Sequence, residues 1–140
     1  MAFQPDHILR VVALAVLAAA AGCSSLGHPK CLRGQQAAIQ DVLYFGAEKP
    51  SGQVTPDDWA HFLGETVTPR FPQGLTAWQA SGQWRSATGD IVREPSYVLS
   101  VVHPAGAGHA SAIREIVVAY QARFQQEAVL QVSSNVCMGF

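Results

Sequence analysis

The chain has 140 residues, of which 49% are hydrophobic and 14% are charged, and its formal net charge at pH 7 is −1. This length suffices for one domain with a single core. Acidic and basic residues are interspersed and form no basic patch, so we expect no nucleic-acid partner.

The N-terminus has the pattern of a bacterial lipoprotein signal. Apolar residues run without interruption from Val11 to Ala21 after Arg10, and Ala21-Gly22 precedes Cys23. A signal peptide contains about 7–15 apolar residues in a row, whereas a helix that spans a membrane needs about 20. The sequence therefore predicts a lipoprotein signal peptide over residues 1–22.

Acylation of Cys23, with palmitate among its acyl chains, would anchor the mature chain to a membrane. Ser24 follows this cysteine, which favours the outer membrane over the inner one. We expect residues 23–35 to form a lipidated tether on the periplasmic face of that membrane. Ordinary secretion, with cleavage after an A-x-A-like site such as Ala19-Ala20-Ala21, is the alternative.

Residues 36–140 are predicted to form one domain with six elements of secondary structure. Runs of β-branched and aromatic residues predict strands, and apolar side chains three and four residues apart predict helices. Thr55 is a natural N-cap and Pro56 fits the first helical position. The expected elements are a strand over Ala37–Phe45, a helix from Thr55 to just before Pro69, strands over Leu75–Arg85 and Ile91–His103, a helix with its apolar face on Ile113–Phe124, and a strand over Ala128–Ser133.

The order β-α-β-β-α-β predicts an α+β fold of the ferredoxin-like, split βαβ type. Right-handed crossovers would place the strands in the order 4-1-3-2, as a four-stranded antiparallel sheet with both helices on one face. The first and last strands would then be antiparallel neighbours.

The cysteines fit this topology. With Cys23 assigned to lipid, Cys31 and Cys137 remain as a pair in an oxidising compartment, which predicts a disulfide. Cys31 precedes the first strand and Cys137 follows the last, so the topology would bring them together. Two free thiols are the alternative. We expect no metal site here, because neither cysteine has a C-x-x-C partner and His28 is the only imidazole nearby.

One face of such a sheet has no helix over it, yet both faces of the predicted strands are apolar. In the third strand Val98 and Val102 alternate with Leu99 and Val101. An open apolar face of this size marks an interface or a ligand groove. A homodimer through this face is one prediction. A monomer shielded by residues 68–74 and the C-terminal tail is the alternative.

The candidate ligand or interaction surface consists of Arg70, Gln83, Trp84 and Glu94. Trp84 and Glu94 would lie on paired strands near one end, which Arg70 could reach from its loop. Arg70 and Glu94 would then bind an anionic or polar ligand, with Trp84 as an apolar platform. In the alternative, an Arg–Glu pair pins the loop to the hairpin and Trp84 is a core residue.

No catalytic or cofactor motif is present. There is no G-x-S-x-G elbow, and Gly106-Ala107-Gly108 is too short to indicate a phosphate-binding loop. His103 and His109 could bind a metal only with a carboxylate from elsewhere. We therefore expect no metal and no cofactor.

Several motifs resemble an uncharacterised bacterial family, the domain of unknown function 3574. The likeness covers about Gln36 to Phe140, and it implies an exported protein, often with a lipoprotein signal and a cysteine near each end, but no activity or ligand. The motifs include Val67-Thr68-Pro69-Arg70-Phe71-Pro72, Gly82-Gln83-Trp84-Arg85 and Arg93-Glu94-Pro95-Ser96.

The sequence thus predicts a lipid-anchored envelope protein that acts as a non-enzymatic binding or interaction module. Its partner would be a small molecule or an envelope protein. The first alternative is a small cofactor-independent enzyme of the dimeric ferredoxin-like type. The second is a periplasmic inhibitor of a hydrolase that acts through the loop over Thr68–Gly74.

Overall fold

The structure is a computed structural model that describes residues 30–140. The predicted signal peptide over 1–22, the acylation site Cys23 and most of the predicted tether lie outside the described residues. In chain order the elements are β1 (Gln36–Gly46), β2 (Glu48–Lys49), β3 (Gly52–Gln53), α2 (Pro56–Phe62), the π-helix η2 (Leu63–Val67), β4 (Thr76–Arg85), β5 (Ile91–His103), α3 (Ala107–Phe124) and β6 (Val129–Met138).

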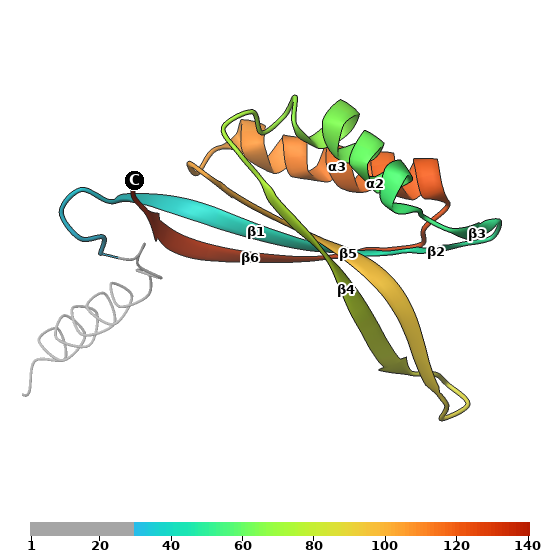
Figure 1. Cartoon of the computed structure of the whole chain (residues 1–140). Helices are drawn as coiled ribbons and strands as arrows, with labels where there is room; N and C mark the ends of the chain where they lie inside the picture. The colour runs from blue at the N-terminus through green and yellow to red at the C-terminus, as the bar shows by residue number, and fades with distance from the viewer. Residues whose placement is uncertain (1–29) are drawn as a thin grey trace, which may run out of the picture.

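The domain is α+β, with a four-stranded antiparallel sheet and two helices, as the sequence predicts. The strand order is β4-β5-β1-β6, and β2 and β3 form a separate two-stranded hairpin. Helices α2 and α3 lie side by side on the same face of the sheet (Figure 1). Among residues 30–140, no helix is both long and apolar enough to cross a bilayer.

Helix α2 begins where the sequence predicts. The Thr55 hydroxyl accepts a hydrogen bond from the Asp58 backbone N–H at 3.1 Å, and the Asp58 carboxylate accepts one from the Thr55 backbone N–H at 3.0 Å. This capping box satisfies two backbone donors that no helical carbonyl can reach. Pro56 occupies the first turn, and the helical path continues through η2 and ends before Pro69.

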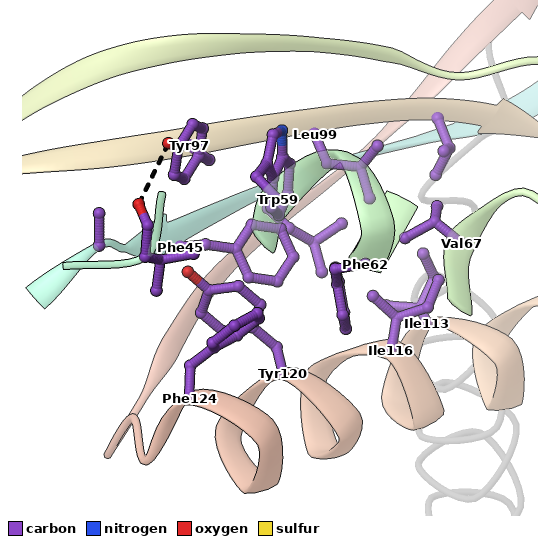
Figure 2. Close-up of a cluster of buried hydrophobic side chains, with 14 of the residues drawn as sticks. Phe45, Trp59, Phe62, Val67, Tyr97, Leu99, Ile113, Ile116, Tyr120 and Phe124 are labelled. Carbon is purple, nitrogen blue, oxygen red and sulfur yellow. Dashed lines mark hydrogen bonds between the residues drawn. The ribbon is translucent and has the colours of Figure 1, made fainter. Parts of the chain in front are cut away.

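The core lies between the helices and one face of the sheet (Figure 2). Aromatic rings dominate it. Trp59 of α2 stacks on Tyr97 of β5 with ring centroids 4.8 Å apart, and the Tyr97 hydroxyl donates to the Val54 carbonyl oxygen. Tyr120 of α3 is fully buried and donates to the Gly46 carbonyl oxygen at 2.8 Å. Other buried members are Leu43, Phe45, Phe62, Val67, Leu99, Ile113, Ile116 and Phe124.

Strands β1 and β6 are antiparallel neighbours, and Ala37 pairs with Cys137 in their register. Cys31 and Cys137 form a disulfide, as predicted, with a Cα–Cα distance of 5.4 Å. The last strand is longer than expected. It was predicted to end at Ser133, but pairing with β1 carries it to Met138.

Candidate functional site

The face of the sheet opposite α2 and α3 carries no helix of the described chain (Figure 1). Side chains alternate between the two faces of a strand. Leu43 and Leu99 at odd-numbered positions lie in the core, so the even-numbered residues of β1, β4, β5 and β6 form what we call the open face. Large apolar side chains between 39% and 62% exposed lie there: Tyr44, Trp78, Trp84, Val102, Leu130 and Val132.

A row of apolar side chains crosses the open face from one edge strand to the other. The register places Trp78 beside Val98, Val98 beside Tyr44, and Tyr44 beside Leu130. Val98 is only 1% exposed although no helix lies over it, whereas Trp78 is 45% exposed. Directly opposed cross-strand side chains pack together, so Trp78 and Tyr44 shield Val98 while their own outer surfaces stay in solvent.

The open face is almost without charge. Among the described residues at its even-numbered positions, Glu94 of β5 is the one charged side chain. Burial raises the pKa of the Glu94 carboxyl, and the nearby charge of Glu48 adds to this effect. Gly46 makes room beside it, because a Cβ built on Gly46 would lie 3.3 Å from Glu94 Oε1 and 2.9 Å from Gln126 Oε1.

A cavity of about 600 Å³ lies at the end of the open face next to the disulfide. Cavities of about 300–1,000 Å³ accommodate small organic ligands. Gln40 Nε2 donates to Ser100 Oγ at 3.0 Å within its lining. None of the lining side chains is ionisable, apart from that of Cys137, which is in the disulfide. They are Gln40, Gln73, Gly74, Leu75, Thr76, Ser100, Val102, Val136, Cys137, Met138, Gly139 and Phe140.

The far ends of β4 and β5 form a two-stranded arm. Strand β5 pairs with β1 only over 96–103, whereas β4 pairs with β5 as far as Arg85 opposite Ile91. Residues 81–85 and 91–95 therefore pair with no third strand of the described chain, and Figure 1 shows this arm extending away from the helices. Trp84 pairs with Val92 in the register, and Trp84 is 47% exposed.

The structure brings together three of the four predicted surface residues. Trp84 and Glu94 lie on the part of the open face that the arm forms. Gln83 precedes Trp84 on the same strand and therefore points to the other face of the arm, where it is paired with Arg93. Trp84 is exposed, so it is not the core residue of the alternative prediction.

Arg70 lies elsewhere. Its Nε donates to Glu115 Oε2 of α3 at 3.1 Å, and its Nη1 donates to the Thr66 carbonyl oxygen at 2.7 Å. The predicted approach of Arg70 to Glu94 is therefore wrong. Residues 68–74 enter the sheet at the start of β4, and Trp84 lies near the other end of that strand.

A buried Asp–His pair joins the middle of β1 to the last residue of β5. His103 Nε2 is 2.8 Å from Asp41 Oδ2, and His103 Nδ1 is 2.8 Å from the Pro104 carbonyl oxygen. Both ring nitrogens of His103 are thus engaged in hydrogen bonds within the fold. The His109 ring stacks on the His103 ring with centroids 4.8 Å apart.

The Asp41 carboxylate is held by hydrogen bonds from several elements. Burial alone would raise the pKa of Asp41, but hydrogen bonds from Ser133, His103 and Gln131 outweigh it and hold the pKa below its ordinary value. In this arrangement neither ring nitrogen of His103 is free to ligate a metal. No group of three or more metal-ligating side chains occurs among residues 30–140. This pair was not predicted from the sequence. Asp41 was the signal that could have revealed it, because an acidic residue there alternates with the core residues Leu43 and Phe45.

The solved structures with a similar fold include two of a phage SAM lyase. A phage SAM lyase in complex with S-methyl-5'-thioadenosine superposes with a TM-score of 0.53 at 13% identity, covering 84% of this chain and 97% of that chain. A phage SAM lyase in the apo state gives a TM-score of 0.50 at 16% identity, covering 84% and 95%. At these identities the likeness concerns the fold alone. No curated protein sequence matches the chain.

One family of sequences does match. Its description is "Protein of unknown function (DUF3574)", and the match covers residues 40–140, which include the motifs around Arg70, Trp84 and Glu94. Because the match spans most of the chain, the protein belongs to the DUF3574 family.

Proposed function

We propose that this protein is an exported, lipid-anchored binding module of the bacterial envelope, and that its open face is the surface that contacts a protein partner. One observation carries the proposal: a broad sheet face with exposed apolar side chains and a single charge. Soluble monomers rarely expose a continuous apolar patch of more than a few hundred Å².

The fold fits this role. We assign it to the ferredoxin-like, split βαβ type. The strand order β4-β5-β1-β6 and the position of both helices on one face support the assignment. In such a fold the helices cover one side of the sheet and leave the other side available for contacts.

A lipid anchor on Cys23 would hold the domain close to a membrane. Cys23 precedes Cys31 by eight residues, and the disulfide fixes Cys31 to the end of β6. The proposed tether would therefore join the sheet at the end that carries the large cavity. Mass spectrometry of the mature protein tests this part: we expect an acylated N-terminal cysteine, and an unmodified N-terminus would contradict it.

The large cavity favours one alternative, a small cofactor-independent enzyme. General acid–base catalysis requires an ionisable side chain within reach of the substrate. The side chains that line the cavity are all neutral, and those of Gln40 and Ser100 are hydrogen-bonded to each other. We therefore favour binding over catalysis. Calorimetric titration with S-methyl-5'-thioadenosine, the ligand of the phage SAM lyase complex, tests the alternative directly: heat of binding that the substitution Ser100→Leu abolishes would support a ligand site there.

Site-specific photo-crosslinking in the bacterial envelope tests the proposed contact surface. A benzophenone amino acid replaces Trp78 on the open face or, as a control, Val118 on α3. Val118 is 63% exposed, so the two positions are matched in accessibility but lie on opposite sides of the domain. We expect a discrete adduct from position 78 and none from position 118. Absence of an adduct at position 78, or equal adducts at both positions, would contradict the proposal.

A further inference from the structure

We propose that the partner on the open face is a second copy of this chain, bound face to face about a twofold axis with the β4–β5 arm of each copy lying across the sheet of the other. This inference rests on the proposed function, since it names the occupant of the same surface. Three properties of the described residues lead to it.

The first property is the isolation of the arm. A two-stranded hairpin is at best marginally stable in water and needs a third strand or a surface to pack against. Pro95 still accepts a hydrogen bond from the Ala47 N–H and Glu94 lies against Gly46, but beyond them residues 82–85 and 91–93 pair with no third strand of the described chain. The arm also exposes large apolar side chains, with Trp84 at 47% and Ile91 at 45%. A face-to-face dimer would give Trp84 and Val92 an apolar surface to cover.

The second property is charge. A twofold interface brings the same patch of both copies together, so each charge on it lies near charges of the same sign. The open face carries only Glu94, at its arm end. The outer surface of α3, in contrast, exposes Arg114, Glu115 and Arg123. The open face is thus the broad surface of the domain that can meet its own copy with almost no charge to desolvate.

The third property is area. The strands of the sheet have 10 to 13 residues. At about 3.3 Å per residue and about 4.8 Å between strands, the face measures about 35 Å by 19 Å. Two copies would bury about 1,300 Å² in total, which exceeds the lower limit of about 1,200 Å² for a specific interface. Trp78 lies on the edge strand β4, at one end of the apolar row that crosses this face, and tryptophan is enriched among the residues that dominate binding energy.

Sedimentation equilibrium of the full chain tests the inference. The chain carries Cys23→Ser, so that it is exported without acyl groups and needs no detergent. We expect twice the monomer mass at high protein concentration and dissociation on dilution. Trp78→Glu should raise the dimer Kd by at least about 30-fold, as expected when a charge replaces an exposed tryptophan that carries much of the binding energy. Val118→Glu, which places the same charge on an exposed apolar site of α3, should change Kd by less than about twofold.

A second variant, Trp84→Glu, distinguishes a weaker dimer from an unfolded domain. Trp84 lies on the arm, outside the core, so Trp84→Glu should leave the circular dichroism spectrum of the domain unchanged while it weakens the dimer. A dimer that survives both tryptophan substitutions would overturn the inference, because its interface would then lie elsewhere.

The outcomes also separate this inference from the proposed function. Suppose that the chain is monomeric at every concentration while the crosslinker at position 78 captures a different protein. The inference that the partner is a second copy is then refuted, whereas the proposal that the open face contacts a protein partner still holds. A monomer with no adduct at position 78 refutes both. An adduct with the mass of two copies of this chain supports both.

Discussion

The Asp41–His103 pair is the most consequential polar interaction in the buried part of the domain. Both side chains are no more than 5% exposed, so each depends on the other and on Gln131, Ser133 and the Pro104 carbonyl for hydrogen bonds. Removal of one member of such a pair leaves a buried polar group without its partner. We expect Asp41→Asn to lower the free energy of unfolding at neutral pH by about 3 kcal/mol, measured by urea denaturation.

The pH dependence of this effect follows from the lowered pKa of Asp41. A carboxyl whose folded pKa lies below its unfolded pKa stabilises the fold above the unfolded value, and this stabilisation is lost as the pH falls through the folded value. The difference between wild type and Asp41→Asn should therefore narrow in acid. Glu127→Gln, at an exposed carboxyl, is the control and should show little effect at any pH. A difference that stays constant into acid would contradict this account of the pair.

Glu94 should behave in the opposite way. Burial, and secondarily the charge of Glu48, raise its pKa, so the folded state binds the proton more tightly than the unfolded state. The stability due to Glu94 is then greatest below the unfolded pKa and is lost as the pH rises through the higher folded pKa. We expect Glu94→Gln to increase the free energy of unfolding at neutral pH and to lose this advantage in acid. Urea titrations at both pH values measure the effect, and a less stable variant at neutral pH would refute it.

Helix α2 shows how far local sequence determines an element. Its start depends on Thr55, Pro56 and Asp58, all within four residues, and Thr55 and Pro56 take their predicted positions. We expect Thr55→Ala to cost about 1 kcal/mol of stability in thermal or urea denaturation, because it removes the acceptor for the Asp58 N–H. Thr68→Ala removes an exposed hydroxyl at the end of η2 that has no hydrogen bond to any residue among 30–140, and it should cost much less. Equal losses would show that the capping box is not the cause.

Elements whose bounds depend on distant partners were predicted less well. Polar residues Ser133 to Asn135 gave no strand signal, yet β6 continues through them because β1 offers an unpaired edge as far as Gln36. The short β2–β3 hairpin lies in a stretch that reads as a loop, and Gln126 Nε2 donates to the Glu48 carbonyl oxygen there. Contacts with residues far away in the sequence determine where these strands begin and end. A short window of local sequence carries no information about such contacts.

The candidate site also has one part that local sequence predicts and one part that it does not. Trp84 and Glu94 lie on paired strands of one hairpin, so turn and strand signals were enough to place them on a common face. Arg70 depends on how the end of η2 meets α3, where Glu115 binds it, and its sequence neighbourhood gave no indication of that contact. Spacing along the chain can therefore assign residues to a strand face, but it does not identify the partner of a long charged side chain in a loop.

The whole domain is layered asymmetrically, and the disulfide lies at one edge of the sheet. Helices α2 and α3 protect one side of the sheet, while β6 is an edge strand that pairs only with β1. Most of its residues are exposed. The bond between Cys31 and Cys137 closes a loop with a sequence separation of 106, so it restricts nearly the whole unfolded chain as well as this edge.

Replacement of both cysteines by serine should reveal these two effects separately. The restriction on the unfolded chain predicts a loss of up to about 4–5 kcal/mol in the free energy of unfolding, measured by urea denaturation. The position of the bond predicts a local effect as well, since residues 134–138 would be held only by hydrogen bonds to β1. Hydrogen exchange should therefore accelerate first in this segment, at denaturant concentrations where Leu43 and Leu99 remain protected. Uniform acceleration over the sheet would show that the disulfide acts only through the unfolded state.

Because Cys137 and Met138 line the large cavity, local fraying would open that end of the face and leave Trp78 and the proposed dimer contact intact.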